Sequence, residues 1–338
     1  MKQKTLLDEE NRLELLSQLG DPLEILNRVI KWEKFRSVLN QGSRKEDTGK
    51  GGRPSYDVVM MFKILVLQRL YNLSDDQTEY QINDRMSFMR FLGINLCEKV
   101  PDAKTIWKFK NDLAETVDKL FCMFDEHLEN KGLISHKGTI VDATFVDAPR
   151  QRNSRDENKK IKNGVIPEEW EKPENKSKLA QKDIDADWTK KNGERHFGYK
   201  DHVKCDADSK LITNYSVTSA SVHDSQRCLV FIGQEDEVLY ADSAYSGKPI
   251  ALALPENCKN QICEKGYRNS PLTSEQKMNN RRKSRIRCRI EQIFGFMTGA
   301  MHGITIRSIG ITRAWMNIGI TNLVYNFCRY SYLKRASA

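Results

Sequence analysis

The spacing of apolar residues predicts that the first third of the chain is helical. Apolar side chains crowd residues 57–71, which indicates a buried helix. Ser74 and Gln77 have the spacing of a capping box, so a second helix is expected to begin there. Between residues 106 and 128 the apolar residues recur at helical spacing, and this pattern predicts one long amphipathic helix that ends near Gly132.

After Gly132 the pattern changes to that of strands. Residues 138–147 and 236–242 are short, β-prone apolar runs, and residues 196–206 and 210–220 predict a hairpin that turns at residues 206–209. Two further helices are expected over residues 283–297 and 317–333, and the second is apolar enough to pack on the sheet.

These elements predict an α fold followed by an α/β fold. We expect a helical domain over residues 1–132 and a mixed-sheet domain over residues 133–338. The length of 338 residues agrees with two domains, because a domain typically has about 150 residues.

A polar insertion interrupts the second domain at about residues 149–195. It is rich in Lys, Asn, Asp and Glu and has few apolar residues, so its composition predicts a mobile loop. Because it leaves the sheet just beyond Asp142, we interpret it as a segment that grips the substrate. Trp170 and Trp188 are its expected anchors.

Positive charge is concentrated in the later part of the chain. The net charge is +9, yet residues 1–132 hold 21 Lys and Arg against 22 Asp and Glu, a net of −1, so the remaining residues have +10. Such an excess suits a polyanionic partner, because cations beside phosphates supply affinity that does not depend on sequence. A basic surface with no partner fits the net charge equally well.

The cysteines and the hydropathy pattern indicate a reduced, cytoplasmic protein. None of the eight cysteines has the paired spacing of a zinc site, and we expect free thiols. No signal peptide is recognisable, and the longest apolar stretch, residues 58–67, is short and is broken by Lys63. We therefore expect no membrane partner.

Three acidic residues suggest a metal site. Asp142 and Asp242 lie in or just after short apolar strands, and Glu291 lies in an arginine-rich helix. Each has an ordinary alternative: Asp142 as a strand residue, Asp242 as a turn former, and Glu291 as the partner of Arg287 one helical turn earlier. Together, however, buried carboxylates require compensating cations, and such a set can hold two divalent cations for phosphoryl transfer on nucleic acid.

Other candidates rank below these three acids. Asp147 is an odd number of residues from Asp142, so a regular strand directs it to the opposite face. Asp224 is a better supporting residue, while His223 and His202 suit a hydrogen bond or a phosphate contact better than direct catalysis. The helical first domain fits DNA binding through a helix-turn-helix, dimerisation or plain packing.

Several ordered motifs resemble one known family. They are Gly51-Gly52-Arg53-Pro54, Leu73-Ser74-Asp75-Asp76-Gln77, Val141-Asp142-Ala143-Thr144-Phe145-Val146, Ala148-Pro149-Arg150-Gln151-Arg152-Asn153, His196-Phe197-Gly198-Tyr199-Lys200, Val222-His223-Asp224-Ser225-Gln226, Ala241-Asp242-Ser243-Ala244-Tyr245 and Arg289-Ile290-Glu291. Spread along the chain in this order, they resemble the DDE transposases of bacterial insertion sequences, specifically the insertion sequence 5 family.

The resemblance implies an RNase H-like catalytic domain in which Asp142, Asp242 and Glu291 hold Mg²⁺, with Mn²⁺ able to substitute. It also implies that the helical domain binds the ends of the element and that Arg287 contacts DNA. We expect further DNA contacts from four residues: Arg285, Arg289, Lys200 and His223. Related families have a Tyr and a Lys where this chain has Ser284 and Thr298.

We therefore expect a transposase that cuts double-stranded DNA at terminal inverted repeats and joins the ends to target DNA. In this hypothesis a cation on Asp142 and Asp242 activates water, and a second on Asp142 and Glu291 stabilises the leaving oxygen. The protein is expected to act as a homo-oligomer, a dimer in the synaptic complex, on the nucleoid of a bacterial cytoplasm. The alternatives are a structure-selective DNA nuclease and a catalytically decayed DNA-binding regulator.

Overall fold

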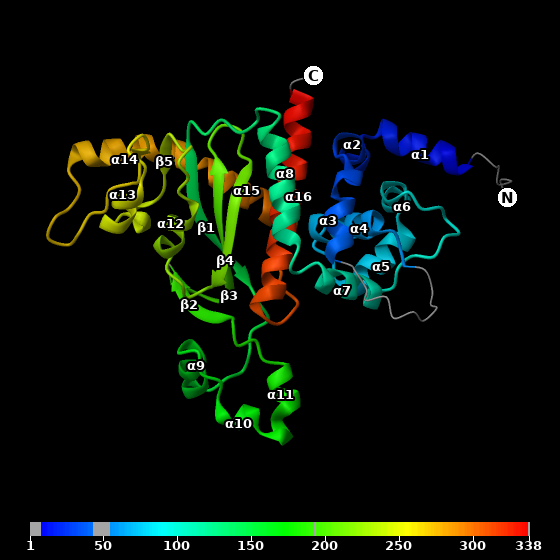
Figure 1. Cartoon of the computed structure of the whole chain (residues 1–338), viewed down its shortest axis with the longest axis horizontal. Helices are drawn as coiled ribbons and strands as arrows, with labels where there is room; N and C mark the ends of the chain where they lie inside the picture. Colours follow the sequence, from blue (N-terminus) through cyan, green and yellow to red (C-terminus); the bar gives the residue numbers. More distant parts are fainter. Residues whose placement is uncertain (1–7, 43–54, 192, 337–338) are drawn as a thin grey trace. The chain divides into compact units, whose positions relative to one another are not determined.

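The computed structural model describes residues 8–42, 55–191 and 193–336, which fall into two compact units (Figure 1). The first unit contains the residues up to Met123 together with those from Leu323 onward, and the second contains Phe124–Asn322. Two helices, α8 (Val117–Glu129) and α16 (Ile311–Ala336), begin in one unit and end in the other. The predicted turn at residues 51–54 lies outside the described residues.

The first unit is helical, as predicted. Besides parts of α8 and α16, its elements are α1 (Asp8–Gln18), α2 (Pro22–Val29), η1 (Trp32–Phe35), α3 (Arg36–Gly42), α4 (Val58–Leu70), α5 (Asp75–Asp84), α6 (Met86–Leu92) and α7 (Ala103–Asp112). Helix α4 confirms the apolar helix expected over residues 57–71. The Ser74–Gln77 capping box is also confirmed, since both of its reciprocal hydrogen bonds are present.

Aromatic side chains form much of the core of this unit. The Trp32 ring lies 5.5 Å from that of Phe91 and 5.4 Å from that of Phe327, both in edge-on contact. Phe327 belongs to the last helix of the chain and is fully buried. The first unit therefore depends on residues from both ends of the sequence for its core.

The single long helix expected over residues 106–128 is wrong. The chain forms α7 and α8 instead, with a turn at residues 113–116 between them. Thr116 stabilises this turn, because its amide and its hydroxyl both donate to the carbonyl of Leu113, at 2.9 and 3.1 Å. A threonine hydroxyl that binds a nearby carbonyl competes with the helical hydrogen-bond pattern.

The second unit is built on a six-stranded mixed sheet. Its strands are β1 (Thr139–Asp147), β2 (Asp187–Lys191), β3 (Glu194–Asp206), β4 (Ile212–Ser219), β5 (Val238–Tyr240) and β6 (Lys259–Asn260). The order is β2-β3-β1-β5-β6, with β4 paired to β3. Strands β1, β3 and β4 are antiparallel, whereas β5 and β6 run parallel to β1. The predicted hairpin and the predicted mixed sheet are confirmed.

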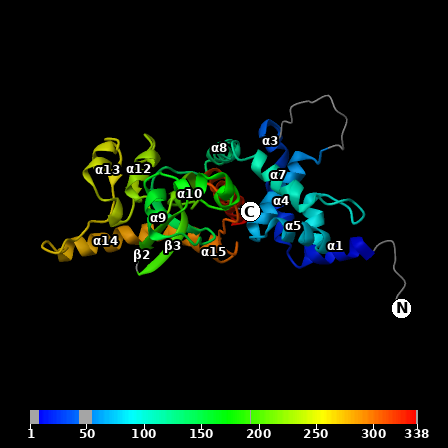
Figure 2. The ribbon, with the colours of Figure 1, turned by 90° about the horizontal axis from the view of Figure 1, so that it is seen from below.

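Helices border this sheet. They are α12 (Ser225–Phe231), η3 (Ser243–Tyr245), α13 (Lys248–Ala253), α14 (Ser274–Arg287) and α15 (Arg289–Thr298), together with the first part of α16. The arginine-rich helix expected over residues 283–297 is two helices, because the chain bends at Cys288, which ends α14 and begins α15. Helix α14 projects away from the sheet, while α15 packs on β1 (Figures 1 and 2).

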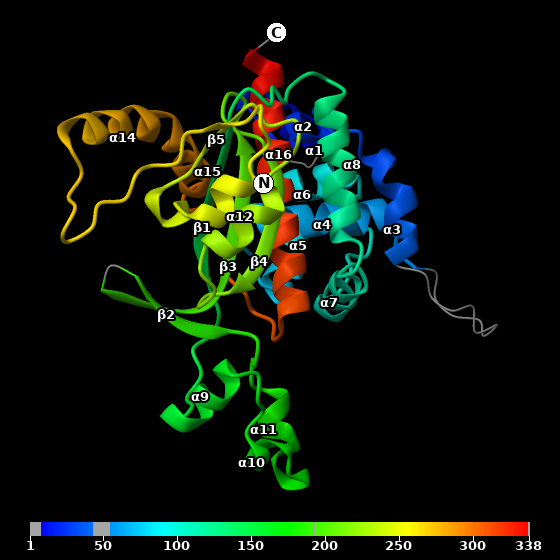
Figure 3. The ribbon, with the colours of Figure 1, turned by 60° about the vertical axis from the view of Figure 1, so that its left-hand side comes forward.

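The insertion is not the structureless loop that its composition predicts. It forms α9 (Arg155–Lys162), α10 (Glu168–Glu171), η2 (Pro173–Asn175), α11 (Lys176–Ala180) and β2, and its helices lie beyond one end of the sheet (Figures 1 and 3). Trp170 is fully buried and its indole donates a 2.7 Å hydrogen bond to Glu157, so the expected anchoring role of Trp170 is confirmed. None of the helices in the described parts of the chain is long and apolar enough to cross a membrane.

A buried carboxyl group joins α16 to the sheet. Asp201 on β3 is fully buried, and its Oδ1 accepts a 3.1 Å hydrogen bond from Asn322 of α16. Burial raises the pKa of Asp201 to about 8, because no cation from the described part of the chain compensates its charge. The carboxyl group is therefore largely protonated at neutral pH.

Asp201→Asn should remove a pH dependence of stability, because asparagine mimics the protonated carboxyl group. The folded-state pKa of about 8 lies above the ordinary value of 3.8, so the stability that protonation contributes is lost as pH rises through this window. The wild-type free energy of unfolding should fall by up to about 1.4 kcal/mol per pH unit relative to the variant. Urea unfolding between pH 5 and pH 9 measures this difference, and parallel curves for the two proteins would contradict it.

Candidate active site

Asp142 lies in the central strand β1 with its side chain only 15% exposed. Its Oδ1 accepts a 2.8 Å hydrogen bond from the amide of Ala143, which fixes the carboxylate. Burial raises the pKa of Asp142 to about 6, and the charge of Asp242 adds to this effect, while the Ala143 amide and Arg287 oppose it. The group is thus a carboxylate that is costly to leave without a cation.

Asp242 follows strand β5 by two residues. Thr139 pairs with Leu239 and Ile140 with Tyr240 in the parallel β1–β5 ladder, so continuing that register brings Asp242 alongside Asp142. Asp242 begins the short helix η3, and its Oδ1 accepts a 2.7 Å hydrogen bond from the amide of Ala244. Each aspartate therefore has one oxygen bound to the backbone and a second oxygen to offer.

Glu291 joins this group through Arg287. The guanidinium of Arg287 donates from Nη1 to Asp142 Oδ2 at 2.9 Å and from Nη2 to Glu291 Oε1 at 2.7 Å. The ordinary pairing of Glu291 with Arg287 is thus present, and the same arginine also bridges to Asp142. The Glu291 side chain is 57% exposed, so it is the least restrained of the three acids.

The three acids have the donor chemistry that a hard divalent cation requires. All offer carboxylate oxygens, the preferred ligands of Mg²⁺, and they come from two neighbouring strands and a helix that packs on one of them. The guanidinium of Arg287 now supplies the positive charge between Asp142 and Glu291. A bound cation would meet the same electrostatic demand, so these residues fit the metal.

Tyr245 is a neighbour that the sequence analysis did not single out. Its side chain is almost fully buried, and its hydroxyl has no hydrogen-bond partner among the residues that the structure describes. Burial together with the nearby charges of Asp142 and Asp242 raises its pKa. The sequence could have indicated Tyr245 as a neighbour of the site, because it lies three residues after Asp242, at the end of the turn that the aspartate begins.

Lys200, expected to contact DNA, is nearly buried. Its ammonium group donates 2.7 Å hydrogen bonds to Asp224 and to the carbonyl of Val222. An ammonium group that already has an anionic partner inside the protein is a poor phosphate contact. The Lys200–Asp224 pair instead links β3 to the segment before α12.

The two histidines occupy different environments. His202 is fully buried on β3, its Nε2 lies 2.8 Å from Thr218 Oγ1, and burial lowers its pKa to about 4, so it is neutral at physiological pH. His223 is exposed, with its Nδ1 2.7 Å from Ser225 Oγ. Of these two, His223 alone is accessible to a phosphate.

The arginines beside Glu291 also divide into two groups. Arg285 is exposed and forms no ion pair with another described residue. Arg289 donates to the carbonyl of Ala207 at 2.7 Å and to Asp208 at 3.1 Å, which ties the start of α15 to the β3–β4 turn. Arg285 is therefore available to an external anion, whereas Arg289 is held by the protein.

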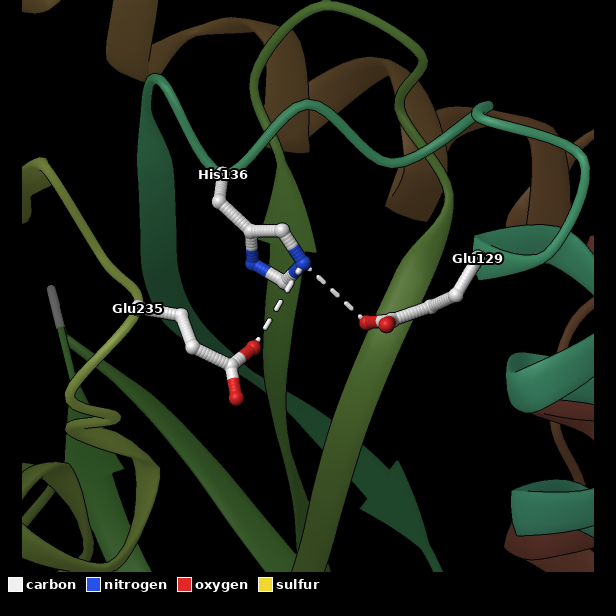
Figure 4. Close-up of side chains that lie close together, drawn as sticks. All are labelled: Glu129, His136 and Glu235. Carbon is white, nitrogen blue, oxygen red and sulfur yellow. Dashed lines mark hydrogen bonds and ion pairs between the residues drawn. The ribbon is translucent and has the colours of Figure 1, made fainter.

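A second charged cluster lies apart from these acids in the sequence (Figure 4). His136 Nε2 is 3.1 Å from Glu129 Oε1 and 3.6 Å from Glu235 Oε2. Among the residues that the structure describes, this is the one set of three potential metal ligands whose donor atoms all lie within 4.8 Å of one another. All three side chains are partly exposed, and a hydrogen bond between His136 and Glu129 accounts for the shorter contact.

Comparisons with known proteins assign both parts of the chain. Residues 10–112 match the family model of a transposase domain (DUF772), and residues 134–327, more than half of the chain, match that of the transposase DDE domain. A cryo-EM structure of a piggyBac transposase synaptic complex with hairpin DNA is similar at 12% identity and a TM-score of 0.43, with 96% of this chain and 83% of that chain covered. The chain thus belongs to the DDE transposase family, and it is an enzyme that cuts DNA and transfers its strands with divalent metal ions.

Proposed function

We propose that Asp142, Asp242 and Glu291 are the catalytic carboxylates of this transposase and hold its divalent cations. The observation that supports this most strongly is the bridge from Arg287 to both Asp142 and Glu291, beside the strand that leads to Asp242. Asp142 and Glu291, which are far apart in sequence, meet here around one positive charge. Burial of Asp142 makes that charge necessary.

The proposed cofactor is Mg²⁺, with Mn²⁺ as a substitute. Carboxylate oxygens suit both ions, and the site contains no thiolate that would favour a softer metal. When bound, such ions generate a hydroxide nucleophile near neutral pH and stabilise the oxygen that leaves phosphorus.

The residues of the chain orient the groups around that chemistry. The amide of Ala143 holds one carboxylate oxygen of Asp142, and the amide of Ala244 holds one of Asp242. The second oxygen of Asp142 accepts from Arg287. Arg287 compensates the carboxylates before metal binds, and then becomes available for a DNA phosphate. Arg285 and the exposed His223 are the proposed additional phosphate contacts.

The proposed substrates are the terminal inverted repeats of an element and its target DNA. The ordered motifs support membership of the insertion sequence 5 family and a bacterial source, with action on the nucleoid in the cytoplasm. We assign DNA-end binding and association to the helical domain over residues 1–132 and catalysis to residues 133–338. The reaction joins two ends, which favours a dimer or a larger assembly.

A cleavage and joining assay tests this function. Purified protein is incubated with Mg²⁺ and DNA that carries the sequences flanking its gene, with Asp142→Asn as the control. Strand-transfer joints from the wild type alone would support the proposal. Nicks without joints would indicate the structure-selective nuclease, and binding without cleavage would indicate the decayed regulator.

Asp242→Asn should abolish cleavage and leave DNA binding intact. The amide keeps the shape of the side chain but removes a charged oxygen ligand, so cleavage should fall by at least about a hundredfold, the upper effect of disturbing a group that only orients a ligand. The matched control is Asp147→Asn on β1, because Asp147 is largely exposed and alternates to the opposite face from Asp142. Equal cleavage by the two variants would remove Asp242 from the site.

Arg287→Gln should destabilise the metal-free protein and increase its response to metal. Asp142 then lacks its cation, so the free energy of unfolding in EDTA should fall by about 1 to 3 kcal/mol, the cost of a buried polar group without its partner. Added Mn²⁺ should stabilise this variant more than the wild type, because no guanidinium competes for the carboxylates. Chemical unfolding with and without Mn²⁺ measures both effects.

Arg285→Gln is the control for this experiment, since the same charge is lost two residues away from a side chain with no ion-pair partner among the described residues. It should behave like the wild type. If Mn²⁺ stabilised all three proteins equally, Arg287 would not share the carboxylates with the metal.

A further inference from the structure

A basic groove in the second unit is lined by residues of helix α9 of the insertion and of the β2–β3 hairpin. Figure 3 shows where these elements lie. Its volume is about 550 Å³. We call it the insertion groove, and its lining residues are Arg155, Asn158, Lys159, Lys162, Asp187, Trp188, Thr189, Lys190 and Arg195. Five of these nine side chains are cationic and one is anionic.

Helix α9 presents three of these cations on one face. Arg155, Lys159 and Lys162 are at positions i, i+4 and i+7, which align on one side of a helix. All three are exposed, and none forms an ion pair with another described residue. Like charges at this spacing repel one another, and the helix dipole favours only Lys159 and Lys162, which lie in the last turn, and not Arg155 at the start of the helix.

The hairpin adds two more cations directly opposite each other. Lys190 on β2 pairs with Arg195 on β3 in the antiparallel ladder, so both side chains extend from the same face. Both are exposed and neither has an ion-pair partner in the described chain. Like charges that face each other across strands are also destabilising. An external anion would relieve the repulsion on both walls of the groove.

Contacts outside the groove hold helix α9 in position. Glu157 closes the capping box with Ser154 and accepts the hydrogen bond from the buried Trp170. Lys178 and Lys182 lie over the Trp170 ring, at 5.4 and 5.2 Å from its centroid. The insertion is therefore held by these contacts, which leaves the cations of the groove free to serve a ligand.

Trp188 supplies an aromatic wall among these charges. It is two residues from Lys190 on the same strand, so the indole and the ammonium group extend from the same face. The indole packs on buried Phe197 at 5.1 Å between ring centroids, and the guanidinium of Arg150 lies over the Trp188 ring at 5.9 Å from its centroid. Cations beside an aromatic ring are the combination that binds single-stranded nucleic acid, with phosphates on the charges and a base stacked on the ring.

We propose that the insertion groove binds a single DNA strand, with an unpaired base stacked on Trp188 and the adjoining phosphates on Lys190, Arg195 and the cationic face of α9. Two observations favour an unpaired strand over a duplex. The volume is that of a small-ligand site, which suits one or two nucleotides. Bases within a duplex are already stacked on their neighbours, so Trp188 can stack only on a base that has left the helix.

This inference rests on the proposed function to the extent that a DNA-cutting enzyme generates unpaired strands. It assigns the groove to the strand beside the break and gives it no part in the chemistry. The groove residues are distinct from Asp142, Asp242 and Glu291, so strand binding and cleavage can fail independently.

The test measures binding of a fluorescent twenty-nucleotide oligo-dT to the full-length protein by anisotropy in EDTA, beside a duplex of the same length. Lys190→Ala/Arg195→Ala should weaken single-strand binding at least about tenfold and lower the salt slope by about 1.4, because each lost phosphate contact contributes about 0.7 on a single strand. Trp188→Ala should weaken it about tenfold, the effect of losing one stacked base. Trp188→Phe should restore most of that loss.

Lys248→Ala/Lys259→Ala is the matched control, because it removes two exposed lysines of the same unit that lie outside the groove. Duplex binding should be unchanged by Trp188→Ala. Three results would overturn the proposal: equal effects of the two double variants, equal loss of duplex and single-strand binding in Trp188→Ala, or no loss in that variant.

Asp142→Asn distinguishes a failure of the groove proposal from a failure of the proposed catalytic site. It should bind the oligonucleotide as the wild type does while it fails to cut DNA. Cleavage that depends on Asp142, together with groove variants that bind single strands normally, would refute the groove and leave the proposed catalytic residues standing. If the groove variants lost single-strand binding but the wild-type protein never cut DNA, the groove would stand and the proposed catalytic function would be refuted.

Discussion

Compensation of buried negative charge is the constraint on which the catalytic region depends. Strand β1 places Asp142 where water is largely excluded, and burial alone would drive it toward its protonated form. Arg287 opposes that tendency by binding Asp142 and Glu291 with different nitrogens of one guanidinium. The same contact holds the junction of α14 and α15 against the sheet. The geometry of the acids and the packing of the C-terminal helices therefore have a common electrostatic cause.

The sequence predicted the sheet and the candidate acids well because both depend on local pattern. Short apolar runs mark β1 and β5, and the acids lie in or just after them. The Arg287–Asp142 contact could not be predicted from the sequence, since it joins residues 145 positions apart and depends on how two elements pack. The burial of Lys200 could not be predicted for the same reason: nothing local indicates that β3 directs its ammonium group to Asp224.

The errors in secondary structure have equally specific causes. Leu113, Val117 and Leu120 are all fully buried, so the apolar period continues through the turn that separates α7 from α8 and conceals it. The insertion is polar enough to resemble a loop, yet its order depends on one buried tryptophan and one capping box. The overall composition of a segment does not reveal single contacts of this kind. The Ser154–Glu157 spacing was a local signal that could have been recognised.

The cations of the second unit fall into two groups, those that bind other parts of the protein and those that do not. Some cations are committed to the protein: Lys200 and Lys204 pair with buried or nearly buried aspartates, and Arg289 binds the β3–β4 turn. Others, in the insertion groove and at Arg285, have no anionic partner among the described residues. Unpaired cations contribute little to folding, which makes them the natural contacts for a polyanion.

The most direct test of the account is a crystal structure with Mn²⁺, in which anomalous scattering locates the ion without reference to any activity. The account predicts an anomalous peak in contact with carboxylate oxygens of Asp142 and Asp242, with Arg287 turned away from Asp142. An ion found only between Glu129, His136 and Glu235, or a site that stays bridged by Arg287 at saturating Mn²⁺, would contradict it.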